Sequence, residues 1–380
     1  MKKLNLIFMM ILVSCCAAFA QATFEENGIL YMEDLSDPSK MAVVVIQKTS
    51  PMDPLNSLYS GSVIIPAHVE HDMDTYEVVG IAPMAFKGEK LEELTIENGP
   101  TMVGDWAFNN SALRRLTYPG SLGRLPHLSS EALEELIIGE GVVEINTVIG
   151  GGKLKKVVFP KSLEVINMCF LNIKDGNLKI GPNIREINMS FTPFTYRDLN
   201  ISGKNAKIWG SFSECPDLQS LDLSGISIIE NSFNDCPMLE ELDLGSVETL
   251  SLAFFDTPAL KRLIIPKHCR QVSSSFFNAN SLELLKIEEG VQTIEKSFFN
   301  TDNLRVLYVP SSLSLNLDLR GNKLEEVHLT SKEPTEECPV YIKNPNTDKL
   351  KVFVPKKSAE NYRKAWEGLI DSQKVEILEE

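Results

Sequence analysis

Acidic side chains recur in the middle of this chain at a spacing that could bring them together. Asp222 and Asp243 are 21 residues apart, and Asp198 and Glu241 occupy related positions. If these segments are neighbouring strands, the four carboxylates cluster on one face with few cations between them. Carboxylates gathered in this way bind a cation such as calcium, or a basic partner. The alternative is four ordinary surface acids that water solvates, and the sequence leaves both open.

Two cysteines share the same spacing. Cys215 and Cys236 are 21 residues apart, and each precedes a proline. Stacked coils would place their Cα atoms about 5 Å apart, within the range of a disulfide; the alternative is a pair of buried thiols. Outside the N-terminal segment the chain has no C-x-x-C pair, so no zinc site is expected. The other cysteines there are Cys169, Cys269 and Cys338.

Catalytic motifs are missing from the sequence. There is no H-E-x-x-H, no G-x-S-x-G, and the run from Gly150 to Lys153 is followed by Leu154, so it is no phosphate-binding loop. The stretch His68-Val-Glu-His71 matches no standard metal spacing, and the other three histidines, His127, His268 and His328, lie far apart along the chain. We therefore expect a protein that is not an enzyme, with no catalytic residues, no cofactor and no metal ligands.

Composition narrows the class of partner. The 380 residues carry a formal charge of -15, with 43% hydrophobic and 23% charged residues. This is an ordinary globular mixture. Nucleic-acid binding is not expected, because contacts with phosphates need a basic field.

The N-terminus resembles an export signal. Lys2 and Lys3 precede an apolar run at 4–13, and Ala18 and Ala20 form an A-x-A cleavage site, which predicts a signal peptide over 1–20. The same segment also fits a lipobox, with Cys15 as the lipidated residue. The first cleavage predicts a secreted protein and the second an outer-membrane lipoprotein, whose only contact with the membrane is the lipid anchor.

One unit, L-x-x-L-x-L or a close variant, recurs along most of the chain. Thirteen registers run from position 91 to position 349 in steps of 20 to 25 residues, three of them in weaker form. The alternation within L-x-L predicts a short strand in each unit. The ten complete copies begin at Leu91, Leu113, Leu133, Leu154, Leu218, Leu239, Leu260, Leu282, Leu304 and Leu324.

A row of phenylalanines keeps the same phase as these leucines. Phe86, Phe108, Phe191, Phe212 and Phe233 each lie five or six residues before a register start. Because a single coil cannot bury its apolar points alone, the pattern predicts stacked coils with one continuous core. We expect a parallel β-sheet of about thirteen coils, mainly β, with an irregular or short helical convex side. The phenylalanines should pack in that core.

The unit resembles that of the BspA-like, Treponema-type leucine-rich repeat surface proteins of bacteria. The family pattern, roughly L-x-x-L-x-I-P followed by V-x-x-I-x-x-x-A-F, matches 91–96 with 102–108, and also 79–86. The resemblance covers roughly residues 59–366. It implies a leucine-rich repeat solenoid and adhesion to host or bacterial surface proteins.

Four segments are expected along the chain. They are the signal peptide at 1–20, an N-terminal β cap at 21–80, the solenoid at 81–356, and a C-terminal capping helix with a tail at 357–380. Strands are predicted at 29–31, 41–46 and 62–65. In the C-terminal helix, Ala359, Tyr362, Trp366 and Leu369 share one face, which should cover the last coil.

Together these features predict an exported, monomeric, non-enzymatic protein at the cell surface or secreted. It would bind a macromolecule, most simply a protein, through its sheet face or loops. The alternative is an exported carbohydrate-binding or envelope scaffold protein. Exposed aromatic side chains would favour glycans, and Tyr308 and Phe353 are the ones expected to project from the sheet.

Overall fold

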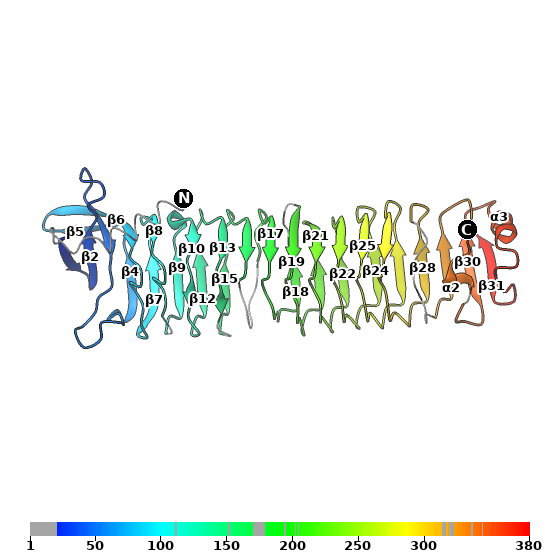
Figure 1. Cartoon of the computed structure of the whole chain (residues 1–380), viewed down its shortest axis with the longest axis horizontal. Coiled ribbons are helices and arrows are strands. Elements are labelled where there is room, and N and C mark those ends of the chain that lie inside the picture. The colour runs from blue at the N-terminus through cyan, green and yellow to red at the C-terminus, as the bar shows by residue number, and fades with distance from the viewer. Residues whose placement is uncertain are drawn as a thin grey trace.

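The structure is a computed structural model of the whole chain. Its described residues are 21–380, apart from 111, 151–152, 170–178, 194, 202, 204, 314–316, 318, 320–322, 336 and 344. The predicted signal peptide and Cys15 lie outside them. The chain winds as an elongated stack of coils, with a β cap at one end and a helix at the other (Figure 1).

The first side of nearly every coil is a strand, most of which carry the leucine repeat, and these strands pair in parallel in three consecutive groups of five, three and six. We call them together the leucine sheet. Twelve of the thirteen predicted registers form a strand, and the remaining one contributes an isolated bridge from Ile180 to Ile201, so the predicted repeat is confirmed. The strands are β4 (Gly61–Ile65), β7 (Leu91–Ile96), β9 (Arg115–Tyr118), β12 (Glu135–Ile138), β15 (Lys156–Val158), β18 (Asp198–Asn200), β20 (Ser220–Asp222), β22 (Glu241–Asp243), β24 (Arg262–Ile265), β26 (Leu284–Ile287), β28 (Val306–Val309), β29 (Glu326–Leu329), β30 (Leu350–Val354) and β31 (Val375–Glu379).

The opposite side of the stack is more regular than expected. In place of irregular or short helical segments, nine coils contribute strands to a second parallel sheet, which we call the back sheet. Its inward residues, such as Ile187, Ile208 and Ile229, are fully buried. The strands are β10 (Arg124–Leu125), β13 (Glu144–Asn146), β16 (Val165–Asn167), β17 (Glu186–Asn188), β19 (Ala206–Trp209), β21 (Ile226–Glu230), β23 (Thr249–Ser251), β25 (Gln271–Ser273) and β27 (Thr293–Glu295).

The phenylalanines form a ladder through the core between the two sheets. From Phe191 to Phe298, rings in successive coils stack nearly parallel with centroids 4.9 to 5.4 Å apart. These rings are buried, as predicted for core packing. Each of these phenylalanines also has a positive φ, between 54° and 63°, because the chain turns sharply where it leaves the back sheet.

The third and fourth coils depart from this plan. The A-F pair is absent there. Leu128 and Ile149, whose side chains are buried, take its place and are paired with each other in two short strands. These strands are β11 (Leu128–Ser129) and β14 (Ile149–Gly150), and a single 3₁₀ turn covers Gly120–Leu122.

The N-terminal cap is a mixed sheet that closes the first coil. It contains β1 (Thr23–Glu26), β2 (Ile29–Glu33), β3 (Ala42–Val45), β5 (His68–His71), β6 (Asp74–Ile81) and β8 (Met102–Val103). The strand expected at 62–65 forms as β4, but it pairs with β7 and so begins the leucine sheet rather than belonging to the cap sheet.

The C-terminal end is closed by a strand as well as a helix. After α2 (Val340–Lys343), α3 (Ala359–Ala365) packs against β31, and Tyr362 and Trp366 are buried. The Trp366 indole donates to the carbonyl of Thr335 at 3.2 Å. Sequence analysis expected only a tail after the helix, whereas residues 375–379 pair in parallel with β30 as the last strand of the leucine sheet.

Among the described residues, neither helix has the length or apolar character needed to cross a membrane.

Candidate functional site

A repeated corner of the coil creates a concave surface. Two residues after Phe212, Phe233, Phe254 and Phe276 the backbone again has a positive φ, at Glu214, Asp235, Asp256 and Asn278, with values of 55° to 59°. Two positions further, the first three of these coils carry a proline. The pair of left-handed residues turns the chain toward the next strand, and stacking aligns the corners.

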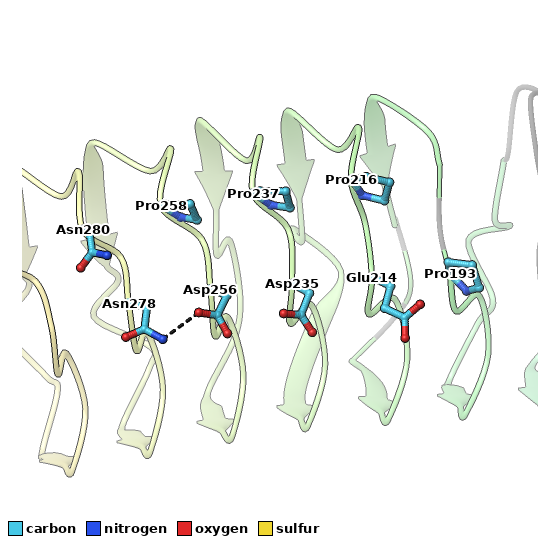
Figure 2. A pocket seen from close by; sticks show the side chains of 9 residues that line it. All are labelled: Pro193, Glu214, Pro216, Asp235, Pro237, Asp256, Pro258, Asn278 and Asn280. Carbon is cyan, nitrogen blue, oxygen red and sulfur yellow. Dashed lines mark hydrogen bonds between the residues drawn. The ribbon is translucent and has the colours of Figure 1, made fainter.

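These corners line an open groove of about 480 Å³ that crosses five coils. Figure 2 shows that three prolines form one row, while carboxylates and Asn278 form a second row beside it. The lining residues are Pro193, Glu214, Pro216, Asp235, Pro237, Asp256, Pro258, Asn278 and Asn280. We call this surface the corner groove.

The corner groove carries three carboxylates without a cation. Within the described part of the chain, no lysine, arginine or histidine nitrogen lies within 4 Å of Glu214, Asp235 or Asp256. Asp256 accepts a hydrogen bond from the side-chain amide of Asn278 at 2.7 Å, and Asn300 donates in turn to Asn278 at 2.7 Å. One end of the groove is therefore acidic and the other end is lined by amides.

Several charges elsewhere in the stack are paired between coils. Glu93 pairs with Arg115, Glu135 pairs with Lys156, and Arg305 pairs with Glu325 at 2.8 Å. Opposite charges on neighbouring strands stabilise a sheet modestly, and like charges destabilise it. The carboxylate row of the corner groove lacks such stabilisation between coils.

The need for a positive φ accounts for only part of this row. Asp and Asn tolerate the left-handed region better than most residues. Asn can adopt a positive φ without adding a charge, as Asn278 does. Glu, the residue at position 214, lacks the preference for positive φ that Asp and Asn have. The negative charge at three successive coils therefore needs another explanation.

The four acids predicted from the sequence lie on the leucine sheet and divide into two kinds. Asp222 and Asp243 are direct neighbours across β20 and β22. Each carboxylate accepts a backbone N–H two residues later, from Ser224 at 2.9 Å and Gly245 at 2.8 Å. These two acids hold turns, and Asp222 also accepts from Asn200.

Asp198 and Glu241 are exposed but are not neighbours. Both pair with Ser220, which lies between them, so they are two strands and about 10 Å apart. Among the residues that the structure describes, no three His, Cys, Asp or Glu side chains gather closely enough to hold a metal ion.

Tyr308 lies in a short aromatic stack on the same sheet. Its ring lies 4.1 Å from that of His328, which lies 4.6 Å from that of Phe353, with each pair nearly parallel. The His328 Nδ1 lies 2.9 Å from a carboxylate oxygen of Glu380. The His328 ring therefore has an aromatic ring on each face, and Tyr308 and Phe353 each have one face covered by it.

Cys215 and Cys236 lie beneath the corner groove as free, buried thiols. Burial, together with the neighbouring Cys236 thiol, raises the pKa of Cys215 far above its ordinary value. A thiol in this state is a poor nucleophile.

Sequence analysis missed the corner groove although a signal for it was present. The triplet acidic residue, any residue, proline occurs at 214–216, 235–237 and 256–258, always 21 residues apart. A set of exposed apolar side chains that includes two tryptophans was also not predicted, and each lies at the end of a strand of the cap sheet or the back sheet, or within three residues after it. This set contains Met84, Trp106, Met168, Met189 and Trp209, each 43% to 48% exposed.

The repeated sequence also shows which protein family the chain belongs to. Residues 75–174 and 207–317, more than half of the chain, match the sequence profile described as BspA type leucine rich repeat region, in six copies. The chain belongs to the BspA type leucine-rich repeat family. The predicted family and solenoid fold are therefore confirmed for this BspA type protein.

Solved structures with a similar fold come from several bacteria. A leucine-rich repeat protein from Bacteroides ovatus is 18% identical with a TM-score of 0.40, and the match covers 93% of this chain and 99% of that one. The pneumococcal vaccine antigen PcpA is 14% identical with a TM-score of 0.37, covering 96% and 100%. A leucine rich cell surface protein from Faecalibacterium prausnitzii is 15% identical with a TM-score of 0.30, covering 82% and 96%. These similarities are too low to indicate function, and no curated protein sequence matches the chain.

Proposed function

We propose that this BspA type protein is exported and non-enzymatic, and that it binds a partner protein at the cell surface or outside the cell, as an adhesin does. The corner groove is the binding surface. The signal-like segment at 1–20 supports export, with Cys15 as the lipid anchor if the lipobox is used.

The observation that carries this proposal is the row of three unpaired carboxylates beside a row of prolines. Prolines offer rigid apolar surface, and carboxylates without a cation of their own attract a basic partner and suppress acidic ones. A basic partner would remove the repulsion within the row when it binds.

The experiment compares two acidic surfaces of the same protein. Mature chain starting at Gln21 is immobilised and a panel of extracellular matrix and bacterial surface proteins is passed over it. One triple variant neutralises the groove, with Glu214→Gln, Asp235→Asn and Asp256→Asn. Its matched control removes three exposed acids elsewhere, with Asp198→Asn, Glu241→Gln and Glu230→Gln.

We expect a bound protein to be lost from the groove variant and retained by the control. The reverse result would place the interface on the sheet faces outside the groove and contradict the groove. Mass spectrometry of the exported protein tests its location, since a chain that begins at Gln21 is released and a lipidated Cys15 is anchored.

Carbohydrate binding is the second candidate, and one observation favours it. The Trp106 residue is 45% exposed, and its ring lies edge-on, 4.5 Å from the ring of His127, three residues after the end of β8. Exposed aromatic faces stack on sugars. A glycan array with wild type and Trp106→Ala tests it, and signals that the variant retains would exclude this ring as a sugar platform.

A further inference from the structure

We infer that the corner groove takes a single extended segment of the partner in the polyproline II conformation, with a lysine or arginine at every third residue. The inference rests on the proposed function and adds the conformation and spacing of the ligand. Hydrogen bonding and charge spacing lead to it, and the length of the groove is compatible with it.

The corner groove is long enough for a short extended chain. The phenylalanine rings beneath it, from Phe191 to Phe276, are 4.9 to 5.4 Å apart, so the groove is about 20 Å long. Polyproline II rises about 3.1 Å per residue, so about six residues span this length.

The walls cannot hydrogen-bond an added β-strand. One row consists of Pro216, Pro237 and Pro258, which have no backbone N–H. The N–H groups of the acidic row are already used, since Asp235 donates to the carbonyl of Phe255 and Asp256 to that of Phe277. A polyproline II segment needs no partner for its backbone, because water solvates it.

The carboxylate spacing matches the period of this conformation. Beneath Glu214 and Asp256, two coils apart, the rings of Phe212, Phe233 and Phe254 are separated by 5.2 and 5.4 Å, so the two acids are about 10 Å apart. Polyproline II has three residues per turn and rises about 3.1 Å per residue, so residues i and i+3 share a face about 9 Å apart. Two cations at i and i+3 can therefore meet the outer carboxylates while Asp235 lies between them.

The groove also gives the segment a direction. Past Asp256 the rows continue as Asn278 and Asn280, which carry no charge. The amide of Asn278 is fixed on Asp256 by its hydrogen bond. The cationic residues of the partner therefore lie toward Glu214, and uncharged residues, of which proline packs best on proline, lie toward Asn280.

The test uses isomeric peptides that differ only in the spacing of two lysines. The first is Pro-Lys-Pro-Pro-Lys-Pro-Pro, with lysines at i and i+3, and the second is Pro-Lys-Pro-Lys-Pro-Pro-Pro, with lysines at i and i+2 on different faces. Both carry a fluorescent label, and polarisation is measured at 10 mM and 150 mM salt. We expect the first to bind about two- to fivefold more tightly at low salt, the value of one additional exposed ion pair.

Two single variants distinguish the effect of lysine spacing in the peptide from the effect of the net charge of the groove. Asp256→Asn removes the carboxylate that the second lysine meets, so it should abolish the preference between the isomers. Asp235→Asn should weaken both peptides and keep the preference. Asp198→Asn, which removes one charge outside the groove, should change neither.

Equal binding of the isomers, or a preference that survives Asp256→Asn, would overturn the inference. Either result would leave the proposed function intact if the triple variant with Glu214→Gln, Asp235→Asn and Asp256→Asn still fails to bind the partner protein. Failure of both peptides to bind while that partner still needs the groove would also overturn only the inference. A partner that binds the groove triple variant normally would instead refute the proposed function.

Discussion

The side-chain amide of Asn278 donates a hydrogen bond of 2.7 Å to the carboxylate of Asp256 in the preceding coil (Figure 2). One coil earlier, Asp235 occupies the same position, and the coils on either side of it present a carboxylate. The same corner of the coil is thus stabilised by a hydrogen bond at one end of the groove and subject to charge repulsion at the other.

Neutralising the middle acid should therefore stabilise the free protein. Asp235→Asn removes two like-charge neighbours and adds a donor that, by analogy with Asn278 and Asp256, faces Glu214 in the preceding coil, so we expect unfolding to become less favourable by roughly 0.2–1 kcal/mol at low salt. The gain should shrink in 1 M NaCl, where the Debye length is about 3 Å. The opposite change, Asn278→Asp, should lower the melting temperature. A salt-independent gain for Asp235→Asn would contradict the repulsion.

The phenylalanine ladder should carry much of the stability. The rings of Phe212 and Phe233 are 5.2 Å apart and almost parallel, and both are fully buried. We expect Phe233→Ala to cost about 3–5 kcal/mol in urea unfolding, because it leaves a cavity between two rings. Phe299, which is 37% exposed, provides the control, and Phe299→Ala should cost much less. Similar costs would argue against ladder packing.

The C-terminal strand should protect the end of the leucine sheet. Deleting residues 375–380 removes β31 and exposes the edge of β30, and bare strand edges recruit other chains. We expect the shortened protein to self-associate in analytical ultracentrifugation, while the full chain stays monomeric. The control deletes only Glu380, which leaves β31 in place. Monomeric behaviour of the longer deletion would show that α3 alone covers the edge.

The five cysteines of the described region should be reduced and slow to react. Burial raises the pKa of Cys169 to about 11 and that of Cys269 to about 12, so little thiolate forms near neutral pH. A thiol reagent at pH 8 should label the native protein slowly and the denatured, unreduced protein at five sites. A count of three would instead indicate a bond between Cys215 and Cys236.

Acid should destabilise the stack in part through Glu140. Its carboxylate accepts the backbone N–H of Lys161 at 2.9 Å and that of Ser162 at 3.2 Å, and these bonds lower its pKa below the ordinary 4.5. A lowered folded pKa gives stability above pH 4.5 that is lost as the pH falls through the folded value. Glu140→Gln should flatten the fall in melting temperature below pH 4.5. The exposed Glu131→Gln serves as control and should leave the slope unchanged.

The repeat was readable from the sequence because burial imposes it. Leu94 and Leu116, for example, contact each other across β7 and β9 and are almost completely buried, so both must be apolar at a fixed spacing. The same argument placed Phe233 and Trp366 in the core. Short strands under this constraint can be counted from the spacing of their leucines.

The candidate site was less accessible to such reasoning. Spacing correctly made Asp222 and Asp243 neighbours, but their carboxylates turn back to their own backbone. Glu214 and Asp235 were not predicted as a site, and their spacing alone does not indicate that they share a groove with Pro216 and Pro237. That arrangement depends on two left-handed residues at each corner, and an exposed side chain leaves no periodic trace of its direction.

The sequence alone therefore determined a stack of coils and the identity of its buried ladders, because each apolar position must meet its counterpart in the next coil. Only the tertiary structure decided that β4 and β31 extend the leucine sheet, that the opposite side is a regular back sheet, and that prolines and acids form one groove. These features depend on how backbone turns are oriented and which edges remain open, and hydrophobic periodicity does not encode either one.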